Sequence, residues 1–284
     1  MRFEQDPYRW SKTPATRRLA PTRIAVTLED HTSNVMAKIF ITGSADGLGQ
    51  LAASALLAEG HQVVLHARNE KRGQEALNKV AGAETVLTAD LGDIDETKQL
   101  AAKVNALGKF DAVIHNAGVY QTSPDEIFTV NTLAPYVLTC LIKRPQRLVY
   151  LSSGMHLSGR AKLEDLETNV GRITYSDSKL HVVMLCLAVA REWPRVYANA
   201  VDPGWVPTKM GGPGAPDDLR KGYETQVWLA VSDDEKAKVS GRYFHHKAET
   251  SHNREADDVQ MQDKLLSVCK EITGVSFRKR MTGR

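Results

Sequence analysis

Tyr175 and Lys179 stand one helical turn apart in the run Tyr-Ser-Asp-Ser-Lys, and side chains at that spacing share one face of a helix. The reference pKa of a tyrosine is about 10, so a shift to neutrality takes roughly 4 kcal/mol of differential interaction. A lysine ammonium beside the phenol favours the phenolate. The pair is therefore a candidate proton donor and acceptor for an alcohol or a carbonyl, although such pairs are also common on helix surfaces.

A glycine-rich loop, Thr42-Gly-Ser-Ala-Asp-Gly-Leu-Gly49, follows the first apolar run of the chain, 37–42. A helical pattern follows the loop and ends at Gly60. Glycines permit a tight turn and close backbone approach, while a helix N-terminus favours an anion, so the loop is a candidate site for a dinucleotide pyrophosphate. An ordinary glycine turn is the alternative interpretation of the loop taken alone.

Arg68 lies just past the second apolar run, 61–66, where dinucleotide-binding folds carry a residue that contacts the adenosine ribose. An acidic residue there would bond the ribose hydroxyls, whereas an arginine suits a 2′-phosphate. Ala67 and Arg68 supply no acid, which favours NADP(H) over NAD(H). Asp46 in the glycine loop weighs against phosphate binding, and an exposed loop arginine is the alternative.

The elements that must position these residues alternate between short apolar runs and helical patterns. This alternation predicts an α/β fold: a Rossmann-type, doubly wound, mainly parallel sheet of about seven strands with helices on both faces. We expect strands over 37–42, 61–66, 85–89, 112–115, 147–151, 196–201 and 241–244. Helices are expected up to 57 and over 70–80, 94–106, 131–141, 175–192 and 223–231, with a weak one near 259–272.

The composition is that of an ordinary globular protein, with 284 residues, 42% of them hydrophobic, and a net charge of +3. A charge so close to zero argues against nucleic acid or an anionic membrane as a partner. Cys140, Cys186 and Cys269 lack metal-ligand spacing, so we expect no metal and interpret them as thiols in a reducing, cytoplasmic environment. No apolar run is long enough to span a bilayer.

A set of short motifs follows in a fixed order along 38–245. They are the glycine loop Thr42–Gly49, Asp90-Leu91, Asn116-Ala-Gly118, Asn131, Ser152-Ser153, Tyr175-x-x-x-Lys179 and Pro203-Gly-Trp-Val-Pro-Thr208. Each has a plain explanation by itself, as a turn, a strand end or a solvated side chain. The ordered set resembles the short-chain dehydrogenase/reductase family in its classical form, with one departure at His115, where the family usually has asparagine.

The resemblance implies how a cofactor is held. Asp90 would bond the adenine and Leu91 would flank it, while Asn116 and Gly118 would line the cofactor at the end of the fourth strand. Tyr175 and Lys179 would lie at the nicotinamide end. The remaining cofactor contacts that the resemblance implies are Gly43, Ser44, Gly47, Leu48, Gly49, Arg68, Pro203, Val206 and Thr208.

The resemblance also implies a reaction, hydride transfer between NADPH and a carbonyl or alcohol substrate. Tyr175 would be the general acid/base, Lys179 would lower its pKa and hold the ribose, and Asn131 would hold a water that replaces the proton. Ser153 would polarise the carbonyl, with Ser152 supporting the turn. His156 could contact the substrate, but a loop histidine with no catalytic duty is favoured.

Three regions follow from these expectations. Residues 1–35 are rich in Arg, Thr and Pro without an amphipathic period, which favours a disordered extension, or a chain that begins at Met36, over an organellar transit peptide. Residues 36–245 would form the Rossmann-fold catalytic domain. Residues 246–284 would form a peripheral tail with a helix.

Two other functions stay open. A nucleotide-sugar epimerase usually has different glycine spacing and a larger substrate domain than the residues after 245 allow. A non-catalytic redox sensor that binds NADP typically loses the tyrosine or the lysine, and both are present here.

The segment 154–173 is longer than the family's common form, and some carbonyl and retinol reductase-like members carry a similar insertion. We expect it to form a loop beside the substrate. Met155, Leu157, Trp205 and Met210 fit an apolar pocket wall, and surface or core positions explain them equally well.

Family members often pair the helices that carry Asn131 and Tyr175 into homodimers or homotetramers. The apolar Val182, Val183, Leu185 and Cys186 fit such an interface, and burial inside the monomer explains them as well.

Overall fold

The computed structural model describes residues 36–164, 166 and 170–278. The chain splits into two units, Met1–Val35 and Met36–Arg284. The expectations for 1–35, a disordered extension or a transit peptide, fall outside the described residues. All helices and strands named below belong to the second unit.

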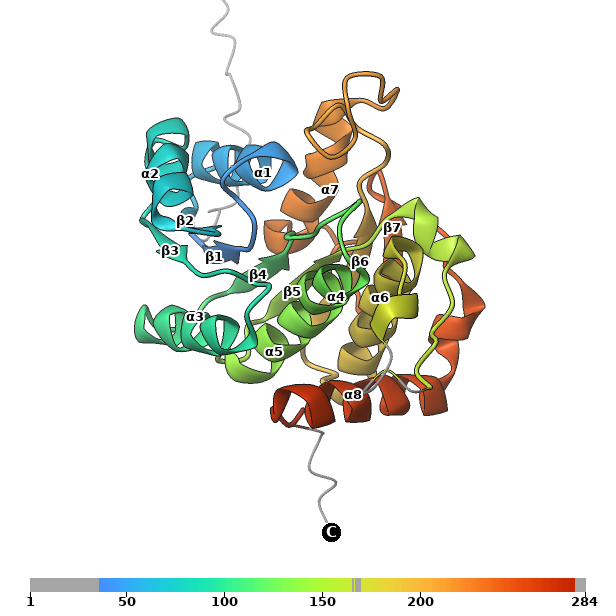
Figure 1. Ribbon diagram of the computed structural model, residues 1–284. Helices are drawn as coiled ribbons and strands as arrows, with labels where there is room; N and C mark the ends of the chain where they lie inside the picture. Colours follow the sequence, from blue (N-terminus) through green and yellow to red (C-terminus); the bar gives the residue numbers. More distant parts are fainter. Residues whose placement is uncertain (1–35, 165, 167–169, 279–284) are drawn as a thin grey trace, which may run out of the picture. The chain divides into compact units, whose positions relative to one another are not determined.

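One eight-stranded sheet runs through the described residues (Figure 1), in the order β3-β2-β1-β4-β5-β6-β7-β8. The first seven strands are parallel, and β8 is antiparallel to β7. This confirms the predicted doubly wound sheet and adds a short edge strand that the sequence pattern does not reveal. The strands are β1 Lys38–Ile41, β2 Gln62–Ala67, β3 Thr85–Thr88, β4 Ala112–His115, β5 Arg147–Leu151, β6 Tyr197–Asp202, β7 Arg242–His245 and β8 Ala248–Glu249.

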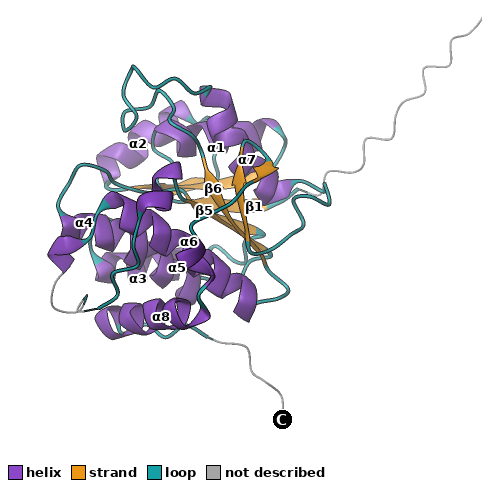
Figure 2. Cartoon of the chain, turned by 90° about the vertical axis from the view of Figure 1, so that its right-hand side faces the viewer, coloured by secondary structure: helices purple, strands orange, loops and turns teal. Residues whose placement is uncertain are grey.

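Helices cover both faces of the sheet (Figure 2). They are α1 Gly47–Ala58, α2 Glu70–Lys79, α3 Ile94–Ala106, α4 Pro124–Phe128, α5 Ala134–Leu141, α6 Tyr175–Glu192, α7 Leu219–Val231 and α8 Val259–Thr273. Because successive side chains of a strand point to opposite faces, Phe40 of β1 joins the apolar core with α3, α5 and α6, whereas Ile39 and Ile41 join the core with α1 and α7. None of the described helices is long and apolar enough to cross a membrane.

The helical segment that carries Asn131 begins earlier than the sequence predicts and is not regular. Its first turn is α4, which starts at Pro124 after the N-cap Ser123, whose hydroxyl accepts from the Glu126 N–H at 3.2 Å. A π turn, Thr129–Leu133, then joins α4 to α5. Few helices contain a π turn, but those that do often have it at a functional site. This π turn contains Asn131. No periodicity in the sequence marks it.

The chain beyond β8 differs from the peripheral tail that the sequence predicts. Helix α8 packs against α6 (Figure 1) and buries Leu265, Leu266 and Cys269 in the core that α6 shares. The Tyr136 hydroxyl donates to the Val275 carbonyl at 2.7 Å, and the rings of Trp193 and Phe277 stack with centroids 4.9 Å apart. The described part of the tail is therefore a structural layer of the domain.

This layer also explains the apolar stretch of α6. Val182, Val183, Leu185 and Cys186 are all buried in the same core as α8. Of the two explanations that the sequence leaves open for them, burial inside the monomer is the one that the structure shows.

Candidate active site

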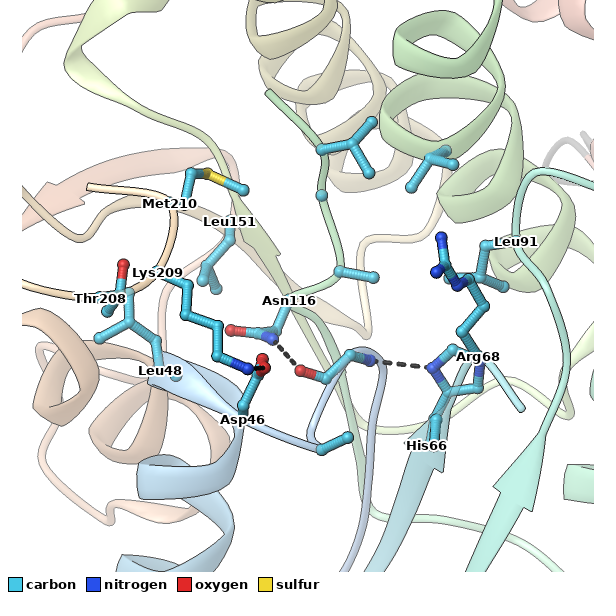
Figure 3. A pocket seen from close by; sticks show the side chains of 18 of the residues that line it. Asp46, Leu48, His66, Arg68, Leu91, Asn116, Leu151, Thr208, Lys209 and Met210 are labelled. Atoms are coloured by element: carbon cyan, nitrogen blue, oxygen red, sulfur yellow. Dashed lines mark hydrogen bonds and ion pairs between the residues drawn. The ribbon is translucent and has the colours of Figure 1, made fainter. Parts of the chain in front are cut away.

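A cavity of about 560 Å³ lies at the carboxyl edge of the sheet, where β1 and β4 are neighbours although the chain crosses between them (Figure 3). Open α/β sheets bind ligands at such a switch point. The glycine loop forms one wall of the cavity, the ends of β2 and β3 a second, and the start of α6 with the segment after β6 a third.

The glycine loop adopts a conformation that only glycine fits. Gly43 has φ +63°, and a Cβ there would lie 2.8 Å from the Ala117 Cα. A Cβ on Gly49 would lie 2.4 Å from the side-chain nitrogen of Asn116. That nitrogen donates to the carbonyls of Thr42 and Gly43, each at 3.0 Å. Asn116 therefore binds the loop to the end of β4.

His66 fixes the same loop from the other side, and the sequence analysis did not single it out. The Gly43 N–H donates to His66 Nδ1 at 2.9 Å, so Nε2 carries the proton and donates to the Ala89 carbonyl at 3.1 Å. Burial lowers the pKa of His66 to about 4. The Ser44 hydroxyl accepts from the His66 N–H and donates to the Ile41 carbonyl. The predicted cofactor residue Ser44 thus directs its side chain into the turn.

The start of α1 leaves its backbone donors available. Its N-cap residue, Asp46, makes no side-chain capping hydrogen bond. The Asp46 carboxylate instead pairs with Arg72 at 2.5 Å and with Lys209 at 2.9 Å. Burial raises the pKa of this carboxyl, but the two cations outweigh that effect and the net pKa is lowered. Arg72 and Lys209 are two cavity residues that the sequence analysis missed.

Arg68 lines the cavity beside His66 and Leu91, across from the Asp46–Lys209 pair (Figure 3). Val206 is buried and packs where α7 has Gly222, and it does not line the cavity. Gly49, Ser44, Ser153 and Asn131 also lie outside the lining. The predicted residues that do line it are Gly43, Gly47, Leu48, Arg68, Asp90, Leu91, Asn116, Gly118, Tyr175, Lys179, Pro203 and Thr208.

Tyr175 is the first residue of α6, which a capping box between Thr174 and Asp177 begins. The Ser153 side chain lies close enough to the Tyr175 hydroxyl to lower its pKa, and the Tyr175 ring contacts that of Tyr120 with centroids 4.8 Å apart. The pKa of Tyr175 is raised to about 12, chiefly by burial; the Ser153 side chain lowers it, and the charge of Asp202 adds to the increase. Lys179 is not among the groups that shift the pKa of Tyr175 here, so the expectation that Lys179 lowers this pKa stays a prediction.

Lys179 is buried, and burial lowers its pKa to about 8. Its Nζ donates to the Leu151 carbonyl at 2.9 Å and lies 5.5 Å from the centre of the Tyr175 ring. A Cβ on Gly118 would lie 3.2 Å from this nitrogen and 3.3 Å from Asn131 Oδ1. The side chains of Lys179 and Asn131 therefore both lie next to Gly118, just after the end of β4.

Asn131 is held rigidly. Its Oδ1 accepts from the Val119 N–H at 2.8 Å, and its Nδ2 donates to the Val119 carbonyl and to the Ser178 hydroxyl, both at 3.0 Å. The two amide hydrogens are thus both committed.

A buried network behind Ser153 is a further feature that the sequence pattern does not predict. The Ser152 hydroxyl donates to the Lys179 carbonyl at 2.9 Å. His156, treated above as a loop histidine, is fully buried, and its Nδ1 lies 2.7 Å from the Ser153 carbonyl. Its Nε2 accepts from the Asn253 N–H at 3.2 Å. The segment after β8 therefore anchors the turn that carries Ser153.

Comparison with known proteins agrees with this arrangement. A family model described as short chain dehydrogenase matches residues 37–143. An uncharacterised oxidoreductase of Emericella nidulans is 44% identical over 253 residues, which cover 84% of this chain and 98% of the relative. The short-chain dehydrogenase chyC of Penicillium rubens is 40% identical over 258 residues, covering 85% of this chain and 99% of the relative.

Solved structures share the fold. An uncharacterised protein from Mycobacterium paratuberculosis superposes with a TM-score of 0.73 at 24% identity, over 85% of this chain and 95% of that one. A blue fluorescent protein from a metagenomic library, in complex with NADPH, gives 0.62 at 18% identity, over 75% and 97%. Together with the relatives above, the ordered motifs and the cavity at the switch point, these likenesses establish that the chain belongs to the short-chain dehydrogenase/reductase family and is an oxidoreductase.

Proposed function

We propose that this oxidoreductase transfers a hydride between NADPH and a ketone or aldehyde, with the secondary or primary alcohol as the product. The observation that carries the proposal is the meeting of the Tyr175 hydroxyl, the Ser153 side chain and the buried Lys179 at the carboxyl edge of the sheet. A proton donor, a hydrogen-bond donor for the carbonyl oxygen and a buried cation are the groups that carbonyl reduction requires of a protein.

The residues of the cavity fit a dinucleotide. The free N–H groups at the start of α1 suit a pyrophosphate. A Cβ added at Gly47 would meet no atom closer than 3.9 Å, so the space beside this residue is open to the pyrophosphate. Asp90 and Leu91 line the cavity where an adenine would lie. When bound, the nicotinamide supplies the hydride, and the protein supplies position and electrostatics.

NADPH is favoured over NADH by the charges at the adenosine end. Arg68 lines the cavity at the end of β2, with no carboxylate at positions 67 or 68. Asp46, which weighs against a phosphate in the sequence, is balanced by Arg72 and Lys209. An arginine fork is suited to a 2′-phosphate.

Tyr175, Lys179 and Asn131 have separate roles in the transfer of the proton. A Tyr175 pKa of about 12 keeps the phenol protonated at neutral pH, as a donor to a ketone oxygen must be. Lys179, with a pKa of about 8, is mostly charged there and can hold the ribose hydroxyls. Since both amide hydrogens of Asn131 are committed, a relay water would donate its hydrogen to an oxygen of this residue.

The test combines cofactor binding with turnover. We expect tight NADPH binding by nucleotide fluorescence, and a Tyr175→Phe variant that binds NADPH like the wild type but loses about 100-fold or more in kcat for ketone reduction. Tyr223→Phe, on α7, is the matched control. A Tyr175→Phe variant that keeps full turnover would refute the mechanism, and folded protein that binds neither nucleotide would refute the dinucleotide site.

A further inference from the structure

Five large apolar side chains stand exposed on the segments that follow three neighbouring strands, β4, β5 and β6, and one of the five, Met210, lines the cavity. Tyr120 follows β4, Met155 and Leu157 follow β5, and Trp205 and Met210 follow β6. All of these strands end at the edge where Tyr175 lies. Four of them, Met155, Leu157, Trp205 and Met210, are 44–60% exposed, which rules out the core positions that the sequence leaves open for them. Contiguous exposed apolar surface beside a cavity is typical of a binding surface, and we infer that these side chains form one rim beside Tyr175.

Two aromatic residues of this apolar rim, Tyr120 and Trp205, are fixed by contacts with their neighbours. The Trp205 indole N–H donates to the Gly211 carbonyl at 2.8 Å, and its backbone N–H donates to the Asp217 carboxylate at 2.5 Å. The Tyr120 ring rests on the ring of Tyr175. Rigid aromatic side chains at the mouth favour a flat, apolar ligand body.

One carboxylate, Asp202, lies beneath this rim at the end of β6. Its Oδ1 accepts from the Gly204 N–H at 2.9 Å. Its Oδ2 lies 3.0 Å from where a Cβ on Gly154 would stand, directly after Ser153. The side chain is 17% exposed, so a small ligand group can reach it.

Asp202 Oδ2 has one long contact with a neighbouring side chain, that of His245. His245 Nδ1 lies 3.3 Å from the Asp202 backbone carbonyl and 3.5 Å from Oδ2, so the shorter approach is to the backbone. The ion pair of Oδ2 with His245 is therefore long, and it carries opposite charges only when His245 is protonated. Asp202 also raises the pKa of Tyr175, which places its field at the reacting group.

We propose that Asp202 selects the substrate: the site takes a ketone with a flat, apolar body and an ammonium or other hydrogen-bond donor beside the carbonyl, and rejects one with a carboxylate there. This inference rests on the proposed carbonyl reduction and names the substrate class of the same site. The apolar body lies against the rim and the donor group meets Oδ2.

The experiment compares three phenyl ketones of similar size with NADPH as reductant. They are α-aminoacetophenone, kept protonated by the buffer, neutral propiophenone and anionic phenylglyoxylate. The variant is Asp202→Asn, whose amide oxygen can still accept from the Gly204 N–H. Asp95→Asn removes the same charge from an exposed position on α3 and is the control.

We expect kcat/KM to fall from the cationic to the neutral to the anionic ketone in the wild type. Asp202→Asn should shrink the cation-to-anion ratio at least tenfold, whereas Asp95→Asn should leave it unchanged. Intrinsic differences in carbonyl reactivity cancel because each ketone is compared between variant and wild type.

Two outcomes would overturn the inference. One is a ratio that Asp202→Asn leaves unchanged. The other is no turnover of any of the three ketones by protein that binds NADPH, because the cationic phenyl ketone carries both required features. The proposed hydride transfer fails separately, when Tyr175→Phe keeps the turnover of whichever carbonyl the wild type reduces.

Discussion

Protonation of His66 should destabilise the folded chain as the pH falls. In the folded protein Nδ1 accepts from the Gly43 N–H and Nε2–H donates to the Ala89 carbonyl, so a second proton has no place in this arrangement. The folded pKa is about 4 and the reference value is 6.5. The unfolded chain therefore binds more protons between these values, and stability declines as pH drops through that window.

The magnitude follows from the two pKa values. Linkage gives a loss of about 2 kcal/mol from His66 between about pH 7 and pH 5. His115, His156 and His181 are buried with lowered pKa values as well, so the wild type loses more than this share. A His66→Gln variant does not titrate but keeps an acceptor and a donor on its amide. Its stability should fall less over the same range, by about 2 kcal/mol.

Urea unfolding at both pH values, for wild type and variant, measures this double difference. The other histidines cancel because both proteins contain them. An equal loss of stability in the two proteins would show that His66 is not held as the neutral tautomer, and the account of the glycine loop given above would fail with it.

Two further perturbations test the cofactor site. Arg68→Ala should raise the Kd for NADPH roughly 30-fold, or about 2 kcal/mol, by removing a charge-assisted hydrogen bond to the 2′-phosphate, and should leave the Kd for NADH unchanged; equal losses for both nucleotides in fluorescence titrations would contradict the assignment. Lys179 is cationic below its pKa of about 8, so kcat/KM for ketone reduction should be level below that pH and decline above it. A pH–rate profile that stays flat through this region would show that the charge of Lys179 is not needed.

The local pattern of the sequence predicts the strands well where both of their faces are buried. The apolar runs at 112–115 and 147–151 became β4 and β5 with the predicted bounds, since strands buried on both faces read as continuous apolar segments. The sequence predicts a helix over 131–141, but the helical segment begins earlier, at Pro124, because the π turn at Thr129–Leu133 depends on packing and leaves no periodic signal.

The sequence predicts which residues form the site better than it predicts their pKa values and hydrogen-bond partners. Tyr175, Ser153 and Lys179 follow from motifs, but the direction of the Tyr175 pKa depends on how deeply the phenol is buried, which spacing does not encode. His66 and His156 act through partners distant in the chain, such as Asn253. A polar residue inside an apolar strand, as at His66, was the only available signal.

The contact between Tyr136 and Val275 joins positions 139 residues apart. Since α8 and the described residues after it cover α5 and α6, that side of the sheet cannot close during synthesis before Val259–Thr273 has left the ribosome. Until then the nascent protein keeps an apolar face of α5 and α6 uncovered. The helix that begins with Tyr175 therefore completes its packing only after about 80 further residues have been synthesised.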